Sequence, residues 1–238
     1  MFHAFSTPAR TLGGAPLKSA ETWIFDLDNT LYPKSSNLFR AVEVRIRDFV
    51  SNLLVIGPEE AFQIQKKYLK EYGTTLGGLM ACHGVDPTEY LDHVHNIDLS
   101  PIGANPDLER ALGRLEGRKH IFTNADAAHA ERIMERIGIR HHFETVFDIE
   151  ATDYVPKPDP GVYKLLVNRL DLDPAGCVMV EDMARNLEPA ARLGMTTVWL
   201  RNDSPWGLEG SDGDHIHHIA DDLVDWLNGI AATGPARG

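Results

Sequence analysis

Short runs of apolar residues alternate along the chain with longer segments of helical periodicity. Five of these runs have the length and composition expected of strands that are buried on both faces of a parallel sheet. The five runs are Thr22–Phe25, His120–Phe122, Thr145–Phe147, Cys177–Val180 and Thr196–Leu200. Strand and helix in repeated succession predict an α/β fold, in which a doubly wound parallel sheet carries helices on both faces.

Helix-capping residues and glycines mark the predicted helices around these strands. The pairs Asn105-Pro106 and Asp159-Pro160 each combine a favoured N-cap residue with proline at the first helical position. Further helices are predicted at Glu131–Ile137, Asn186–Leu193 and Asp221–Ile230.

The segment of residues 32–100 interrupts the alternation, because it contains helical patterns and no strand-like run. Three patterns occur there, of which the second covers Glu59–Tyr72 and the third opens at the capping box Asp86–Glu89. A helical insert of this size is small for an independent domain, so we expect it to pack on the sheet as a cap. The predicted core then comprises residues 1–31 and 101–238.

Composition and charge narrow the classes of function. Of the 238 residues, 43% are hydrophobic and 24% are charged, as in folded globular proteins. The net charge of −12 argues against binding of a nucleic-acid polymer or an anionic membrane. Cys82 and Cys177 are interpreted as reduced core residues, and residues 1–20 lack the apolar stretch of a secretory signal. We expect a cytoplasmic protein with a frayed N-terminal tail, whose oligomeric state the sequence does not set.

Two carboxylates follow the first predicted strand directly. Asp26 and Asp28 are two residues apart, and on an extended segment such residues project to the same side. They stand at the carboxyl end of the strand, where open α/β sheets bind their ligands. An acidic loop that merely ends a strand would give the same pattern, so the other strand ends decide between the two interpretations.

Three further strand ends carry polar residues of complementary chemistry. Thr123 and Asn124 follow the second strand, Lys157 lies between prolines after the third, and Glu181-Asp182 follows the fourth. A turn, a solvated lysine and a helix cap would explain each of them singly. Together they combine carboxylates suited to Mg²⁺ with donors suited to a phosphate group. One carboxylate as nucleophile and a second as general acid and base can divide phosphoester hydrolysis into two steps.

These four segments, in this order and at these strand ends, resemble the motifs of the haloacid dehalogenase-like (HAD) hydrolase superfamily. The resemblance implies a Rossmann-like core with a helical C1 cap inserted after the first strand. It implies that Asp26 is the nucleophile, which forms an aspartyl-phosphate, and that Asp28 protonates the leaving oxygen and then activates water. It further implies that Thr123, Asn124 and Lys157 hold the phosphoryl oxygens.

The same resemblance implies a Mg²⁺ site at the strand ends. Its ligands would be Asp26, the backbone carbonyl of Asp28 and the carboxylate of Asp182, while Glu181 would join directly or through a water. Members that displace halide resemble a D-x-Y-G-T pattern, so Asp28 favours phosphate over halide. Asn29 and Met183 stand where many relatives have Gly and Ser.

Softer similarities point to the pyrimidine 5′-nucleotidase branch of this superfamily. They comprise Asp-Leu-Asp-Asn-Thr-Leu-Tyr-Pro from Asp26, a Gly-rich turn after Tyr72, and Val94–Leu99. Within the turn, Thr74 or Thr75 could bond a base or a sugar, although its glycines could simply join two helices. The leading prediction is therefore a Mg²⁺-dependent phosphomonoesterase acting on a pyrimidine nucleoside 5′-monophosphate.

Several alternatives stay open at this point. The same core residues would serve a sugar phosphate, phosphoglycolate or pyridoxal phosphate as the substrate, or a phosphomutase reaction. A non-catalytic phosphate-binding module is disfavoured, because the nucleophile and its partner carboxylates are all present.

Asp203–Gly213 is interpreted as a loop. His215, His217 and His218 form a cluster and His141-His142 a pair; a metal site from His215 and His217 is conceivable, but a solvated loop is favoured because a regular ligand spacing is lacking. The cap histidines His83, His93 and His95 are interpreted as surface residues, although one of them could touch a substrate.

Overall fold

The computed structural model describes residue 17 and residues 20–232 of the chain. Six strands form one sheet: β1 (Thr22–Phe25), β2 (Arg118–Phe122), β3 (Thr145–Phe147), β4 (Cys177–Glu181), β5 (Thr196–Leu200) and β6 (His218–Ala220). Nearly all of the predicted tail of residues 1–20 lies outside the described residues. Leu17 and Ala20 are described, and both pack against the core.

All neighbouring strands are parallel, in the order β3-β2-β1-β4-β5-β6. Successive residues of β1 alternate between the two faces of the sheet, as a strand requires. Trp23 and Phe25 join one apolar cluster, and Ile24 joins the other. Five helices cover the faces: α5 (Pro106–Arg114), α6 (Ala127–Ile137), α7 (Pro160–Leu170), α8 (Ala184–Arg192) and α9 (Leu223–Ala232).

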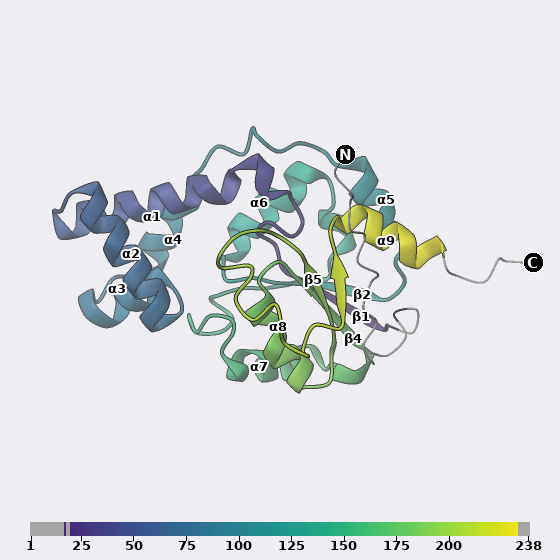
Figure 1. Ribbon diagram of the computed structural model, residues 1–238. Coiled ribbons are helices and arrows are strands. Elements are labelled where there is room, and N and C mark those ends of the chain that lie inside the picture. Colours follow the sequence, from purple (N-terminus) through teal and green to yellow (C-terminus); the bar gives the residue numbers. More distant parts are fainter. Residues whose placement is uncertain (1–16, 18–19, 233–238) are drawn as a thin grey trace, which may run out of the picture.

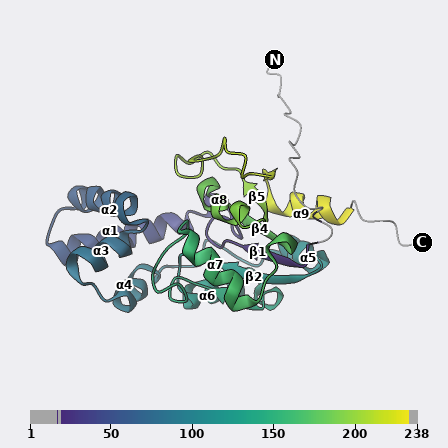
Figure 2. The same ribbon diagram turned by 90° about the horizontal axis from the view of Figure 1, so that it is seen from below.

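The two apolar clusters define the layers of this α/β core. Residues of α5, α6 and α9 pack in the cluster of Trp23 and Phe25, whereas residues of α7 and α8 pack in the cluster of Ile24. The sheet is thus enclosed by helices on both sides (Figures 1 and 2), as the strand and helix pattern predicted. The doubly wound arrangement brings the carboxyl ends of β1, β2 and β4 to one edge, because all three strands run in the same direction.

Four α-helices lie between β1 and the core helix α5: α1 (Leu38–Leu54), α2 (Pro58–Tyr72), α3 (Thr75–His83) and α4 (Pro87–Val94). We call them the helical insert, and they extend to one side of the sheet (Figures 1 and 2). They share a separate apolar cluster that includes Val50, Tyr68 and Leu79. Ile149, from the loop after β3, belongs to the same cluster and thereby ties the insert to the core. Within the described residues, no helix combines the length and apolar character needed to cross a membrane.

Capping residues fix where these helices begin and end. The predicted caps Asn105 and Asp159 accept hydrogen bonds from Leu108 N and Gly161 N, at the starts of α5 and α7. Short 3-10 helices also occur at Lys34–Ser36, Arg140–His142 and Pro174–Gly176.

The structure differs from the sequence-based predictions in several places. Helix α3 occupies the predicted Gly-rich turn, since Thr74 caps it and Gly78 packs against Tyr68, where a Cβ would lie 2.3 Å from the ring. A sixth strand, β6, was missed because its sequence, His-Ile-Ala, contains a single large apolar residue and continues a histidine-rich segment that was interpreted as a loop. Cys82 is exposed rather than buried, whereas Cys177 is buried as predicted.

The histidines of residues 215–218 do not form a solvated loop. His218 is the first residue of β6, and the Nδ1 atom of His217 accepts a hydrogen bond from Thr197 N at 3.0 Å. Nε2 of His215 lies 3.0 Å from the carbonyl of Ala184. These side chains therefore support the edge of the sheet.

Candidate active site

The carboxylate of Asp26 lies just beyond β1 and is held at both oxygens. Its backbone N–H still donates to Val180 O of β4, at 2.9 Å, which fixes the residue against the neighbouring strand. Lys157 Nζ donates to Oδ1 at 2.8 Å, and Thr30 Oγ1 donates to Oδ2 at 3.0 Å. Burial, together with the nearby charge of Glu181, raises the pKa of Asp26 to about 7. The sequence therefore places a buried, oriented carboxylate at the centre of the strand edge.

The ammonium of Lys157 is fully enclosed by three acceptors. Besides Asp26, it donates to Glu181 Oε2 and to the carbonyl of Phe122, each at 2.8 Å. Its side chain is 1% exposed. Burial alone would lower the pKa of Lys157, but the charges of Asp26 and Glu181 raise it above its ordinary value. The lysine is consequently a fixed positive charge rather than the solvated loop lysine that its position alone would suggest.

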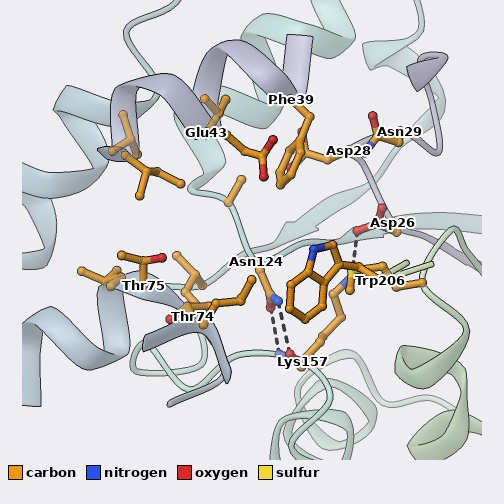
Figure 3. Close-up of a pocket in the computed structure, with 18 of the residues that line it drawn as sticks. Asp26, Asp28, Asn29, Phe39, Glu43, Thr74, Thr75, Asn124, Lys157 and Trp206 are labelled. Atoms are coloured by element: carbon orange, nitrogen blue, oxygen red, sulfur yellow. Dashed lines mark hydrogen bonds and ion pairs between the residues drawn. The ribbon is translucent and has the colours of Figure 1, made fainter. Parts of the chain in front are cut away.

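The side chain of Asn124 holds the backbone of Lys157 in place. Its Oδ1 accepts from Lys157 N at 2.8 Å, and its Nδ2 donates to Lys157 O at 3.3 Å (Figure 3). Thr123 is buried, and its hydroxyl oxygen accepts from Ala125 N at 3.0 Å. Of the three predicted phosphate-binding residues, Asn124 and Lys157 line the cavity described below, whereas Thr123 is not among its lining residues.

Three buried carboxylates gather at this edge of the sheet. Oxygens of Asp26, Glu181 and Asp182 lie within 4.8 Å of one another, an arrangement that could hold a metal ion. Burial, followed by the charges of Glu181 and Asp26, raises the pKa of Asp182 well above its ordinary value. With Lys157 as their ammonium partner, three ionised carboxylates leave a net charge of about −2. A divalent cation with oxygen ligands fits this donor set in both charge and chemistry.

Asp28 faces the same space and contacts a group of buried side chains. Tyr32 OH donates to its Oδ1 at 2.6 Å, and His129 Nε2 lies 3.8 Å from the same oxygen. His129 stacks on His95 with ring centroids 4.1 Å apart, and His95 hydrogen-bonds through Nδ1 to Asp126. Burial would raise the pKa of Asp28, but the imidazole of His129 and the hydroxyl of Tyr32 lower it overall.

A cavity of about 450 Å³ connects this cluster with the helical insert. Asp26, Asp28 and Lys157 line its inner end (Figure 3). Side chains of α1, α2, α3 and α4 line it on the side of the insert, and further core residues, among them Trp206, complete the lining. Much of the wall that the helical insert contributes is apolar, formed by Phe39, Val42, Ile46, Leu69, Leu76, Tyr90, Leu91 and Val94. A volume in this range is typical of small-molecule sites.

The two threonines predicted to contact a substrate both line the cavity, but each hydroxyl also has a structural partner. Thr74 Oγ1 accepts from Gly77 N at 2.9 Å as the N-cap of α3. Thr75 Oγ1 donates to the carbonyl of Gln65 at 3.2 Å. Their contact with a substrate stays a prediction.

Sequence reasoning missed the groups that surround Asp28. His95 was taken as a surface residue of the insert, yet it is 7% exposed and hydrogen-bonds across to Asp126 of the core. His129 was not singled out, although it is fully buried. Tyr32 lies four residues after Asp28, a spacing that brings its hydroxyl back to the carboxylate only because the chain turns at Leu27–Leu31.

The two hydrogen bonds between the Asn124 side chain and the backbone of Lys157, which we call the clamp, lead to a prediction for Asn124→Ala. Loss of both hydrogen bonds frees the backbone of Lys157, so its ammonium no longer has one fixed position. We expect kcat/KM for phosphate esters to fall by about 10- to 100-fold, because small displacements at a reacting centre are costly. The matched control is Asn168→Ala, at an exposed position of α7. Asn202→Ala would not serve as a control, because Asn202 donates a hydrogen bond to the carbonyl of Asp182. Steady-state kinetics with unchanged activity in Asn124→Ala would show that the clamp is dispensable.

Comparisons with known proteins agree with this architecture. A family model described as haloacid dehalogenase-like hydrolase matches residues 21–194. A glyceraldehyde 3-phosphate phosphatase of Methanopyrus kandleri is 27% identical over 208 residues, which cover 81% of this chain and 89% of that protein. Phosphate metabolism protein 8 of Saccharomyces cerevisiae is 28% identical over 199 residues, and the match covers 76% of this chain and 61% of that protein.

The solved structures add a comparison of folds. A HAD phosphatase from Thermococcus onnurineus superposes with a TM-score of 0.59 at 19% identity, covering 88% of this chain and 97% of that chain. This likeness concerns the fold alone. The family model, however, spans well over half of the sequence and includes the residues that form the carboxylate cluster. The chain belongs to the haloacid dehalogenase-like hydrolase family.

Proposed function

We propose that this protein is a Mg²⁺-dependent phosphomonoesterase in which Asp26 is the nucleophile. The observation that carries the proposal is the arrangement of Asp26, whose two oxygens are held by Lys157 and Thr30 at the inner end of a cavity. A nucleophile fixed in this way is prepared for attack without further ordering. The neighbouring ammonium supplies positive charge where a phosphoryl group would lie.

The three-carboxylate cluster fits the metal that this chemistry requires. Asp26 and Asp182 would bind Mg²⁺ together with the backbone carbonyl of Asp28, and Glu181 would contribute directly or through a water. When bound, Mg²⁺ would polarise the phosphoryl oxygens and offset their charge. Glu181 already accepts hydrogen bonds from Lys157 and from Met183 N, which favours a supporting position for it.

The first half of the proposed reaction transfers the phosphoryl group to the protein. A carboxylate oxygen of Asp26 attacks phosphorus, and the bond from phosphorus to the leaving oxygen breaks while the carboxyl of Asp28 gives that oxygen its proton. In the second half, the Asp28 carboxylate takes a proton from water as the water oxygen attacks the phosphorus. Inorganic phosphate is released and the Asp26 carboxylate is restored.

The surroundings of Asp28 suit both of its proposed roles. The lowered pKa of Asp28 in the free protein favours the ionised form, which is the base of the second half-reaction. The negative charge of a bound phosphate raises the pKa of a neighbouring carboxyl, and this favours the proton that the first half-reaction needs. Tyr32 and His129 keep the carboxylate facing the cavity in both states.

For the substrate, we propose a nucleoside 5′-monophosphate, with a pyrimidine base preferred. The helical insert contributes apolar side chains such as Phe39, Ile46 and Leu69 to the cavity, which suit the flat faces of a nucleobase. A nucleobase has flat apolar faces and confines its polar atoms to its edge. A triose or sugar phosphate is the second candidate, and it is supported by the relative named glyceraldehyde 3-phosphate phosphatase.

Phosphate release from a panel of monoesters tests this proposal. The panel contains pyrimidine and purine monophosphates, ribose 5-phosphate, glyceraldehyde 3-phosphate, phosphoglycolate and pyridoxal phosphate, each with and without Mg²⁺. We expect Mg²⁺-dependent release, with the highest kcat/KM for uridine or cytidine monophosphate. Preference for another ester would contradict the substrate assignment, and no release from any ester would contradict the phosphatase assignment and favour a phosphomutase or a binding module.

The metal site has its own test in Asp182→Asn. The substitution removes one of three mutually repelling carboxylates, so we expect the melting temperature without metal to be no lower than in the wild-type protein. Mg²⁺ should raise the melting temperature of the wild type, because it binds the folded state, and should raise that of the variant far less. Asp171→Asn, at an exposed position, is the control. An equal Mg²⁺-induced rise in all three proteins would exclude Asp182 as a ligand.

A further inference from the structure

A buried glutamine without a complete set of partners lies on the wall of the cavity. Gln65 of α2 is 3% exposed, and it lines the cavity among apolar residues of the insert. Its Oε1 has no hydrogen-bond partner within the described part of the chain. An unpaired buried amide is unfavourable for folding, and an apolar side chain of the same size would fill the position without that cost. An amide retained at such a place is best explained by a ligand that completes its hydrogen bonds.

An aromatic side chain reaches the same cavity from the core. Trp206, in the loop after β5, is half-buried and lines the cavity together with Phe39 of α1, which is 38% exposed. In Figure 3 the ring of Phe39 lies on the upper side of the cavity and the indole of Trp206 on the lower side. Aromatic rings on a cavity wall are suited to stacking on a planar ligand ring.

The loop that carries Trp206 is firmly built onto the metal-site segment. Asn202 Nδ2 donates to Asp182 O at 2.7 Å, and Asn202 Oδ1 accepts from Ser204 Oγ at 2.6 Å. Ser204 Oγ in turn accepts from Gly207 N at 2.9 Å. A Cβ on Gly207 would lie 2.2 Å from Asn202 Oδ1, so a larger residue there would displace the Asn202 side chain from its hydrogen bonds. These contacts fix the position of the Trp206 loop relative to Asp182 of the carboxylate cluster.

Two cations approach the indole ring. Lys66 Nζ of α2 is 5.6 Å from the ring centroid, and Arg185 Cζ of α8 is 6.0 Å from it. Both residues line the cavity, and Arg185 Nε has no hydrogen-bond partner among the described residues. The wall around Trp206 therefore offers a donor without a partner, and Gln65 offers an amide that can both accept and donate.

We propose that Gln65 and Trp206 form a nucleobase subsite, in which Trp206 stacks on the face of the base and the Gln65 amide pairs with adjacent donor and acceptor atoms on its edge. This inference rests on the proposed function and specifies which residues select its substrate. A planar ring with a donor next to an acceptor satisfies both features at once. A sugar phosphate has no planar face, and a ring without such an edge leaves the amide unpaired.

The subsite can be tested by comparing a substrate that carries a base with one that lacks it. Uridine monophosphate and ribose 5-phosphate share the phosphate and the ribose, so the ratio of their kcat/KM values isolates the base. Gln65→Leu and Trp206→Ala should each lower kcat/KM for uridine monophosphate by about 10-fold or more, mainly through KM. Both should leave ribose 5-phosphate within about twofold of wild type. Trp226→Phe, outside the cavity, is the control variant.

Stability provides a second readout, since a structural role would act in the opposite direction. Gln65→Leu should melt no lower than wild type, because it removes an unpaired buried amide. Equal losses on both substrates, or a full loss of folding in both variants, would overturn the subsite. Unchanged kinetics with uridine monophosphate would overturn it as well.

A binding experiment distinguishes an error in the proposed subsite from an error in the proposed reaction. Uridine monophosphate is titrated into Asp26→Asn while tryptophan fluorescence is recorded, and then into the same variant with Gln65→Leu or Trp206→Phe added. Quenching that weakens about 10-fold with Gln65→Leu and disappears with Trp206→Phe supports the subsite even if no ester is hydrolysed. Absence of quenching in Asp26→Asn would overturn the subsite, and hydrolysis of ribose 5-phosphate in the wild type would then leave the phosphatase chemistry standing.

Discussion

Asp26→Asn is expected to abolish phosphate release, with a loss of about four orders of magnitude or more in kcat. The amide that replaces the carboxylate cannot form an acyl-phosphate, and no other residue of the cluster occupies its position between Lys157 and Thr30. The fold should persist, because Lys157 keeps Glu181 and the carbonyl of Phe122 as acceptors. Initial rates and thermal melting of the purified variant check both expectations.

The matched control for this result is Asp171→Asn, which makes the same chemical change at an exposed residue with positive φ, a conformation that asparagine tolerates. It should retain wild-type kcat. If Asp26→Asn retained a rate within tenfold of wild type, Asp26 would not be the nucleophile, and a water attacking the ester directly would become the better mechanism.

Lys157→Met should have the largest effect on the protein as a whole. The substitution removes the ammonium that Asp26 and Glu181 share and leaves three buried carboxylates without a cation. Breaking a buried ion pair from one side typically destabilises by about 3–5 kcal/mol. We expect a fall of that order in the free energy of unfolding without metal, together with a loss of activity of about a thousandfold or more, since phosphate would lose a fixed positive charge.

Urea denaturation with and without Mg²⁺ distinguishes the electrostatic cause from a loss of packing. Mg²⁺ should recover part of the lost stability of Lys157→Met, because it supplies positive charge to the same carboxylates. Lys164→Met, an exposed residue of α7, should match the wild-type protein in both measurements. A Lys157→Met protein as stable as wild type in the absence of metal would contradict the charge balance described for the cluster.

The sheet and its polar edge could be predicted from the sequence because both follow from local pattern. Apolar runs bounded by capping residues locate β1, β3 and β5 to the residue, and the parallel order then brings Asp26, Lys157 and Asp182 to one edge. Element type and strand direction were sufficient for this, since the carboxyl ends of parallel strands coincide.

The surroundings of Asp28, helix α3 and the position of Trp206 could not be predicted, because they depend on contacts between residues that are distant in the sequence. The pairing of His95 with Asp126 joins the end of α4 to the start of α6, and His129 of α6 stacks on His95. The glycine-rich composition after Tyr72 predicted a turn. The segment is helical instead, and Gly78 allows helix α3 to pack closely against Tyr68. Trp206 lies in a segment whose polar composition predicted only a loop, and its place on the cavity wall is known only from the fold.

Trapping of the covalent intermediate tests the central claim most directly. Asp28→Asn lacks the base that activates water, so the aspartyl-phosphate should accumulate when the variant is mixed with Mg²⁺ and p-nitrophenyl phosphate, whose leaving group needs no proton. After an acid quench, mass spectrometry of the peptide that contains Asp26 should show the added mass of one phosphoryl group, and Asp26→Asn treated in parallel should show none. Release of p-nitrophenol without any phosphoryl group on that peptide would contradict a nucleophilic Asp26.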